Sequence, residues 1–322
     1  MSDAVATSSP LITADPVREP EHLTPNQRAW LRFKANKPAM LSTLFLILFL
    51  GFIFGWPFIS KTGPDILSND QFQPPNSHHW CGTDIHGRDV FARIIYGARI
   101  SLMVGAVGAL VSLIIGVSWG AIAGYIGGRI DDWMMRAVDV LYSLPSIIFV
   151  IVLITTLEAL LKTWVAQHFS GDVDTTIRLL FLFVGLGAVS WLTMARIVRG
   201  QVLSLRTRSF VLASQSLGAT HARILWRHIL PNVFGIVIVY LTLTVPSIVL
   251  YESFLSYLGL GIQPPMASWG SLIAEGAAQL NAVRIYWWLL VFPCIALVST
   301  LLALNFLGDD LRDAYDPRGQ LG

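Results

Sequence analysis

The stretch Ala213–Asn232, ASQSLGATHARILWRHILPN, lies between two long apolar runs and decides how the whole chain is interpreted. It is polar and basic, has helical character, is interrupted at Gly218 and stops at Pro231. Glycine accepts a positive φ that other residues avoid, and proline disrupts a helix interior. The segment is therefore predicted to form two short helices with a corner at Gly218, held at a membrane face as a docking surface.

The composition outside this stretch is that of a membrane protein. Of the 322 residues, 54% are hydrophobic and 13% are charged, whereas a soluble domain has about 25% charged residues. The net charge of +2 is too small to predict nucleic-acid binding. The chain contains no G-x-x-x-x-G-K-[ST], H-E-x-x-H or G-x-S-x-G motif. We therefore expect it to be neither an ATPase nor an intramembrane protease or hydrolase.

Six apolar runs are each near or above the roughly 20 residues that a helix needs to cross about 30 Å of hydrocarbon. Lipid offers no partner for the backbone, and the runs are too long for barrel strands, so helices are the expected spanning form. The fold predicted is an all-α, polytopic six-helix bundle. The six runs are 39–59, 100–125, 133–157, 177–195, 233–258 and 286–307.

Positive charge predicts the orientation of the bundle, because Lys and Arg accumulate in cytoplasmic loops. Six spans place 15 of the 22 basic residues on one side, together with both termini and the segment around Gly218, and 7 on the other. Both termini are therefore expected in the cytoplasm. Residues 1–23 are predicted to be a disordered tail, 24–38 a basic interfacial helix, and 312–322 a cytoplasmic tail. For residues 24–38, a basic flank that only sets orientation remains an equal alternative.

The second apolar run carries a small residue at every fourth position. Such a stripe forms one helical face on which another backbone can approach closely, so we expect a helix-packing face. The spacing alone does not distinguish packing within the chain from packing against a partner. The stripe consists of Gly108, Ser112, Gly116, Gly120 and Gly124.

The fifth run is unusually polar for a membrane span and is predicted to face a wet cavity or a polar helix contact. Its pathway candidates are Ser247, Tyr251, Glu252 and Ser253. Glu252 is the one carboxylate well inside an apolar run, and such a charge is costly in a membrane. Two interpretations stay open for it: a residue of a transport pathway, or a hydrogen-bonded group that holds helices together.

A group of possible metal ligands precedes the second run: His78, His79, Cys81, Asp84 and His86. Their spacing matches no standard closed site, so no metal site is expected. We expect a turn followed by an amphipathic helix, with Asp84 and Asp89 capping the turn and pairing with Arg88 or Arg93.

The Ala213–Asn232 stretch resembles the cytoplasmic coupling loop of bacterial ATP-binding-cassette (ABC) importer permeases. In that family, Glu-Ala-Ala is followed by three residues, a glycine, and later an apolar-Leu-Pro ending. Here Leu212, Ala213 and Ser214 stand at the first three places, and Gly218 and Ile229-Leu230-Pro231 keep their spacing. Further stretches resemble the dipeptide, oligopeptide and nickel permeases, most closely the oligopeptide "C" subunit. These are GTDIHGRDVFARIIYGARISL, YIGGRIDDWMMR, SFLSYLGLGIQPPMASWG and LGDDLRDAYDPR.

The resemblance implies a permease domain over residues 39–311 of the type I ABC importer kind, with a coupling loop at about 199–232. It implies that this chain forms a peptide pathway with a second, homologous permease in the bacterial inner membrane. It also implies an extracytoplasmic substrate-binding protein and two ATPase subunits, which hold the ATP and Mg while this chain binds no cofactor. The implied coupling residues are Ala213, Ser214, Gly218, Ala219, His221, Arg223, Arg227, Leu230 and Pro231.

Two other functions are weighed against an ABC permease. A proton-coupled secondary transporter would use Glu252 and predicts transport by the chain alone, with internal inverted repeats that the sequence does not display. A membrane scaffold without transport predicts no polar pathway helix, which the fifth run argues against. The transported substrate stays open among peptides, nickel chelates, glutathione and sugar-peptides.

Overall fold

The computed structural model describes residues 30–31, 33–34, 36–59, 63–168, 174–264, 266–280 and 284–315. The side chains of residues 157–159 and 161–184 are not described. The predicted tail 1–23 and residues 316–322 of the C-terminal tail lie outside the described residues. Within them the chain is helical and has no β-strand; its ladder pairs are two isolated bridges, Thr83 with Asp89 and Leu280 with Ile285.

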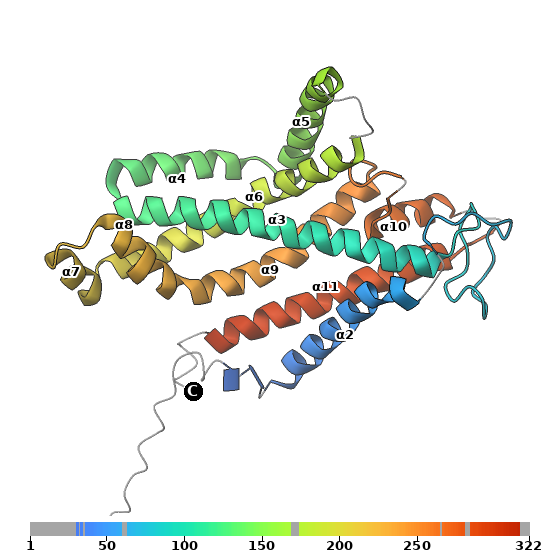
Figure 1. Cartoon of the computed structure of the whole chain (residues 1–322), viewed down its shortest axis with the longest axis horizontal. Coiled ribbons are helices and arrows are strands. Elements are labelled where there is room, and N and C mark those ends of the chain that lie inside the picture. The colour runs from blue at the N-terminus through green and yellow to red at the C-terminus, as the bar shows by residue number, and fades with distance from the viewer. Residues whose placement is uncertain are drawn as a thin grey trace, which may run out of the picture.

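The helices follow the predicted apolar runs (Figure 1). The long ones are α2 (Lys37–Ile59), α3 (Val90–Ile126), α5 (Ser146–His168), α6 (Asp174–Arg206), α9 (Leu230–Tyr257) and α11 (Trp288–Tyr315). Shorter helices α4 (Gly128–Ser143) and α10 (Trp269–Ala278) precede α5 and α11. Among the described residues, four helices are long and apolar enough to cross a membrane, or five if the bent pair α4 and α5 counts as one span.

The third predicted span, 133–157, is not one straight helix. The chain bends by 94° between α4 and α5, at Leu144 and Pro145. Proline removes a backbone donor and disfavours a helical conformation for the residue before it, and Leu144 has an extended ψ of 138°. α4 runs beside α3, and α5 turns away from its line (Figure 1).

α3 and α6 form the central helix pair of the molecule. The small-residue stripe of α3 faces α6 and α9 along its whole length. A Cβ added to Gly116 would lie 2.6 Å from the Cβ of Met194, and one added to Gly124 would lie 2.8 Å from the carbonyl oxygen of Arg199. The stripe therefore lies in a contact within the chain, which spacing alone left open. Ser112 is fully buried in the same contact.

The segment between α2 and α3 folds onto the N-terminal ends of α3 and α11 and onto α10. Trp288 Nε1 donates to the carbonyl of Thr83 at 3.3 Å, and the ring of Phe72 stacks on that of Tyr286 at 4.1 Å. Buried Arg93 of α3 joins this segment to α10. It donates to Asp84 at 2.8 Å and to both carboxylate oxygens of Glu275 at 2.5 and 3.0 Å. The segment is thus a structured cap.

Two of the possible metal ligands in this cap, His79 and Asp84, have other side-chain partners. Asp84 accepts from Arg88 Nε at 2.7 Å, as expected, and His79 Nδ1 lies 2.8 Å from Asp89. Asp89 also caps α3 by accepting from the amide of Ala92. Burial, with the nearby Asp89 charge, raises the pKa of the Cys81 thiol to about 11. Among the described residues, no three such side chains are placed to hold a metal ion.

Part of the predicted interfacial helix 24–38 is described, and it contacts the end of α11. Phe33 is buried with Ala39 and Ala314. Asn36 donates to Asp310 at 2.5 Å, while Trp30 is half exposed and carries the Lys34 ammonium 4.9 Å from its ring centre. The rest of that predicted helix lies outside the described residues.

Candidate functional site: a corner of short helices and a hydroxyl-lined cavity

The corner predicted around Gly218 is built from three short helices between α6 and α9. They are α7 (Ser209–Ser216), α8 (His221–Ile224) and a single π turn, η1 (Leu225–Ile229). Gly218 has a φ of +76° and ends α7 by donating its amide to the carbonyl of Gln215. Thr220 then caps α8 by accepting from the amide of Arg223. The local sequence therefore fixes both the turn and the start of the second helix.

Three buried apolar side chains hold this corner on the bundle. Val211, Ile224 and Ile229 are fully buried and pack in one cluster with Val198 and Val202 of α6. These three residues, one from each of the corner's short helices, thus face inward. A movement of the corner would be carried into α6 by close packing, because tightly packed interiors transmit strain.

The predicted coupling residues mostly line the outward face of the corner. Gly218 itself is exposed, and a Cβ there would meet nothing within 4 Å. His221 is exposed but bonded, with Nδ1 2.9 Å from the hydroxyl oxygen of Tyr125 at the end of α3. The exposed members are Ala213, Gly218, His221, Arg223, Arg227 and Pro231, and the half-buried ones are Ser214, Ala219 and Leu230.

Two large apolar side chains project from the same face and were not predicted. Leu217 is 88% exposed and Trp226 is 72% exposed. Exposed apolar residues of this size in a polar segment are a signal of a protein contact. Leu212, at the place where the resembled permeases usually have Glu, is 50% exposed as well. The corner therefore presents an apolar as well as a basic surface.

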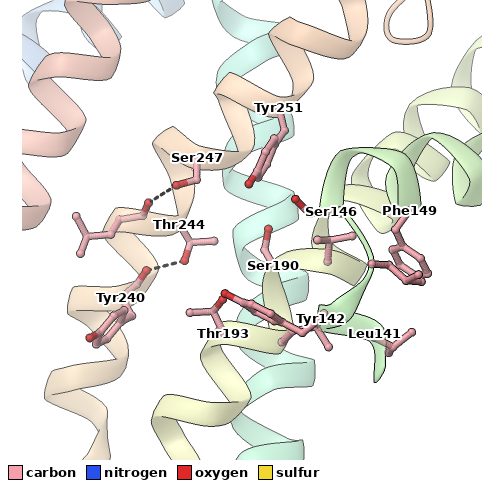
Figure 2. Close-up of a pocket in the computed structure, with 14 residues that line it drawn as sticks. Leu141, Tyr142, Ser146, Phe149, Ser190, Thr193, Tyr240, Thr244, Ser247 and Tyr251 are labelled. Atoms are coloured by element: carbon pink, nitrogen blue, oxygen red, sulfur yellow. Dashed lines mark hydrogen bonds between the residues drawn. The ribbon is translucent and has the colours of Figure 1, made fainter. Parts of the chain in front are cut away.

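A cavity of about 370 Å³ lies between the α4–α5 break, α6 and α9. Figure 2 shows hydroxyl groups from all three sides of this space, among them Ser146, Ser190, Thr244 and Ser247. The rings of Tyr142, Phe149, Tyr240 and Tyr251 complete the wall. The cavity is thus amphipathic, as suits a wet passage.

Several of the hydroxyls are already bonded within their own helices. Thr244 Oγ1 donates to the carbonyl of Tyr240 at 2.6 Å, and Ser247 Oγ to that of Leu243 at 3.1 Å. Ser190 Oγ likewise donates to the carbonyl of Leu186. Such back-bonding satisfies a polar side chain inside an apolar helix.

The four pathway candidates separate into two groups. Ser247 and Tyr251 line the cavity. Glu252 is fully buried on the other side of α9, where it accepts from Ser101 at 2.9 Å and Ser256 at 2.7 Å, and Ser253 is buried next to it. Ser101 also accepts from the amide of Trp269 at 3.3 Å. The geometry around Glu252 matches the interpretation of a group that joins helices, here α3, α9 and the start of α10.

Two ion pairs join α4 to α6, and the sequence analysis did not find them. Arg199 donates to both oxygens of Asp131 at 2.5 and 2.7 Å, and Arg196 donates to Asp139 at 2.7 Å. The Arg196 guanidinium also lies 4.0 Å from the centre of the Tyr142 ring, which lines the cavity. The partners are 57 and 68 residues apart, so no local spacing could have revealed them.

Known proteins give a consistent comparison. The family model described as "Binding-protein-dependent transport system inner membrane component" matches residues 116–319, and that of the "N-terminal TM domain of oligopeptide transport permease C" matches residues 24–75. The chain is 45% identical to the dipeptide transport system permease protein DppC of Bacillus subtilis, over 95% of this chain and 89% of that one. It is 44% identical to the oligopeptide transport system permease protein OppC of Escherichia coli K12, over 91% of each.

Solved structures show the same fold at lower similarity. The chain aligns with an inward-facing structure of the MetNI methionine ABC transporter with a TM-score of 0.53 and 19% identity. The alignment covers 70% of this chain and 96% of that one.

Proposed function

Because the chain belongs to the binding-protein-dependent transport system inner membrane components, we propose that it imports peptides, as a permease subunit of an ATP-driven importer. The membrane permease role follows from the family. The peptide substrate is inferred from dipeptide and oligopeptide permeases that share 42–45% of its residues over at least 90% of its length.

The exposed corner around Gly218 is the observation that carries the coupling part of the proposal. It combines a fixed turn, a buried apolar anchor on α6, and projecting Leu217 and Trp226. A rigid helix pair of this kind can pass rigid-body motion between subunits. We assign it as the contact for a cytoplasmic ATPase subunit, which would hold the ATP and Mg. A complete importer would contain two such ATPases.

The hydroxyl-lined cavity is assigned to the translocation pathway. It is bounded by α4–α5, α6 and α9 of this chain, and a second, homologous permease would close its remaining side. An extracytoplasmic substrate-binding protein would deliver the peptide at the opposite end from the corner. Both termini would then lie in the cytoplasm with the corner.

The rival proton-coupled carrier is disfavoured by the position of Glu252. A coupling carboxylate has to exchange protons with water along the pathway. Glu252 is fully buried, is bonded to serine hydroxyls of α3 and α9, and is not among the residues that line the cavity.

Reconstitution distinguishes the two functions. The complex with its partner permease, ATPases and binding protein is placed in liposomes, and uptake of a labelled tripeptide is measured. We expect uptake to require ATP and to survive collapse of the proton gradient. Uptake driven by a proton gradient without ATP would establish the carrier instead, and retention of a nickel chelate but no peptide by the binding protein would overturn the substrate assignment.

A further inference from the structure

A second cavity, of about 770 Å³, lies at the cytoplasmic end of α3, apart from the hydroxyl-lined one. The ends of α3 and α6 form one side, and α7 and α8 form the other. The wall combines apolar Ile122, Ile126 and Leu212 with polar Tyr125, Arg206 and His221. None of its lining residues is shared with the pathway cavity.

The apolar wall continues an exposed stripe along α3. The stripe lies opposite the small-residue face that packs on α6, and its members are 42–59% exposed: Met103, Leu110, Ile114, Ile122 and Ile126. The stripe is exposed in the single chain, and two of its members, Ile122 and Ile126, also line the second cavity.

The polar wall carries one fixed positive charge, the guanidinium of Arg206. Arg206 is half buried at the last turn of α6 and donates to the carbonyl of Gly124 at 3.3 Å, which fixes its guanidinium beside the end of α3. Tyr125 and His221 stand opposite, bonded to each other at 2.9 Å. Residues 199–232 contain no Asp or Glu, so no acidic side chain of this segment neutralises the cavity.

We propose that this cavity binds the headgroup of an anionic phospholipid of the inner leaflet, with the phosphate at Arg206 and His221 and an acyl chain along the α3 stripe. Basic pockets between membrane helices on the cytoplasmic side are suited to anionic headgroups. The lipid would contact α3, α6 and both short helices of the corner at once. It would hold the corner against the bundle.

The proposal is tested on the purified complex of all subunits by native mass spectrometry. Delipidated complex is titrated with phosphatidylglycerol in a background of phosphatidylcholine, and the lipid retained is counted. Arg206→Gln is compared with Arg208→Gln, because Arg208 is exposed two residues away and does not line the cavity. We expect preferential retention of phosphatidylglycerol by the wild type, about fivefold weaker in Arg206→Gln and unchanged in Arg208→Gln.

Two further arms separate a lipid from a free phosphate. Ile126→Ser changes the apolar wall without removing charge, so it should also weaken lipid retention. Soluble glycerol phosphate should not displace the bound lipid, because it lacks acyl chains. Equal retention of both lipids by the wild type, equal losses in the two arginine variants, or displacement by glycerol phosphate would each overturn the proposal. The wild-type measurement decides even if a variant fails to assemble, and none of these results depends on the transported substrate.

Discussion

At the scale of single residues, Gly218 forms the corner because glycine, which lacks a Cβ, accepts a positive φ. Its φ of +76° lies in the left-handed region, where a β-branched residue is strained by about 1 kcal/mol or more. The space around it is open, so any effect of substitution comes from the backbone and not from a clash.

We therefore expect Gly218→Val to insert and pair with its partner permease in normal amount, but to retain less ATPase and lose peptide uptake. Gly218→Ala should be milder, because alanine is not β-branched. Gly200→Val is a matched control, since Gly200 also has open space and lies in a regular helix. Co-purification of the ATPases and uptake in liposomes are measured. Unchanged values for Gly218→Val would remove the corner from the coupling mechanism.

At the scale of elements, the α3–α6 contact leaves no room for a Cβ at Gly116, Gly120 or Gly124 of the small-residue stripe. A Cβ at Gly120 would lie 3.0 Å from the amide nitrogen of Arg199 and from the Cβ of Val198, and closer still to the carbonyl of Ala195. These are mostly backbone atoms, so a side chain at Gly120 could be accommodated only if the two helices moved apart. Overfilling a packed contact costs about 1–3 kcal/mol.

Gly120→Leu is therefore expected to lower the yield of folded protein and its melting temperature in detergent. Gly55→Leu in α2 adds the same side chain where a Cβ meets nothing within 4 Å, and it should behave as the wild type. Fluorescence-detected size exclusion after a heat step measures both. If the two variants melted together, the close α3–α6 contact would not stabilise the fold.

The elements also show where sequence reasoning succeeds and where it stops. Apolar length predicts the long helices, and a glycine inside a polar segment of helical character predicts the corner, because these signals are local. Apolar length alone makes 133–157 one span, whereas the chain bends by 94° at Leu144 and Pro145 within it. The Asp131–Arg199 pair and the separation of Glu252 from the cavity depend on packing between distant segments, which no spacing encodes.

At the scale of the whole molecule, the cap between α2 and α3 and the corner of α7 and α8 lie at opposite ends of the bundle (Figure 1). Single cysteines test the predicted orientation in a background that lacks Cys81 and Cys294. Cysteines at Asn69 in the cap and at Gln279 after α10 should react with an impermeant maleimide added outside intact cells. A cysteine at Ser204, exposed near the end of α6, should react only after permeabilisation. External labelling at Ser204 would invert the topology.

The back-bonded hydroxyls of the cavity have a consequence for what the passage can recognise. The hydroxyls of Ser190, Thr244 and Ser247 already donate their hydrogen bonds to carbonyls of their own helices. Their oxygens can still accept hydrogen bonds from water, but they have no free O–H to donate to a cargo side chain. These three positions would wet the passage without selecting among cargo side chains. Any hydrogen bond donated to a cargo would then have to come from other hydroxyls of the wall, such as those of Ser146, Tyr142 and Tyr251.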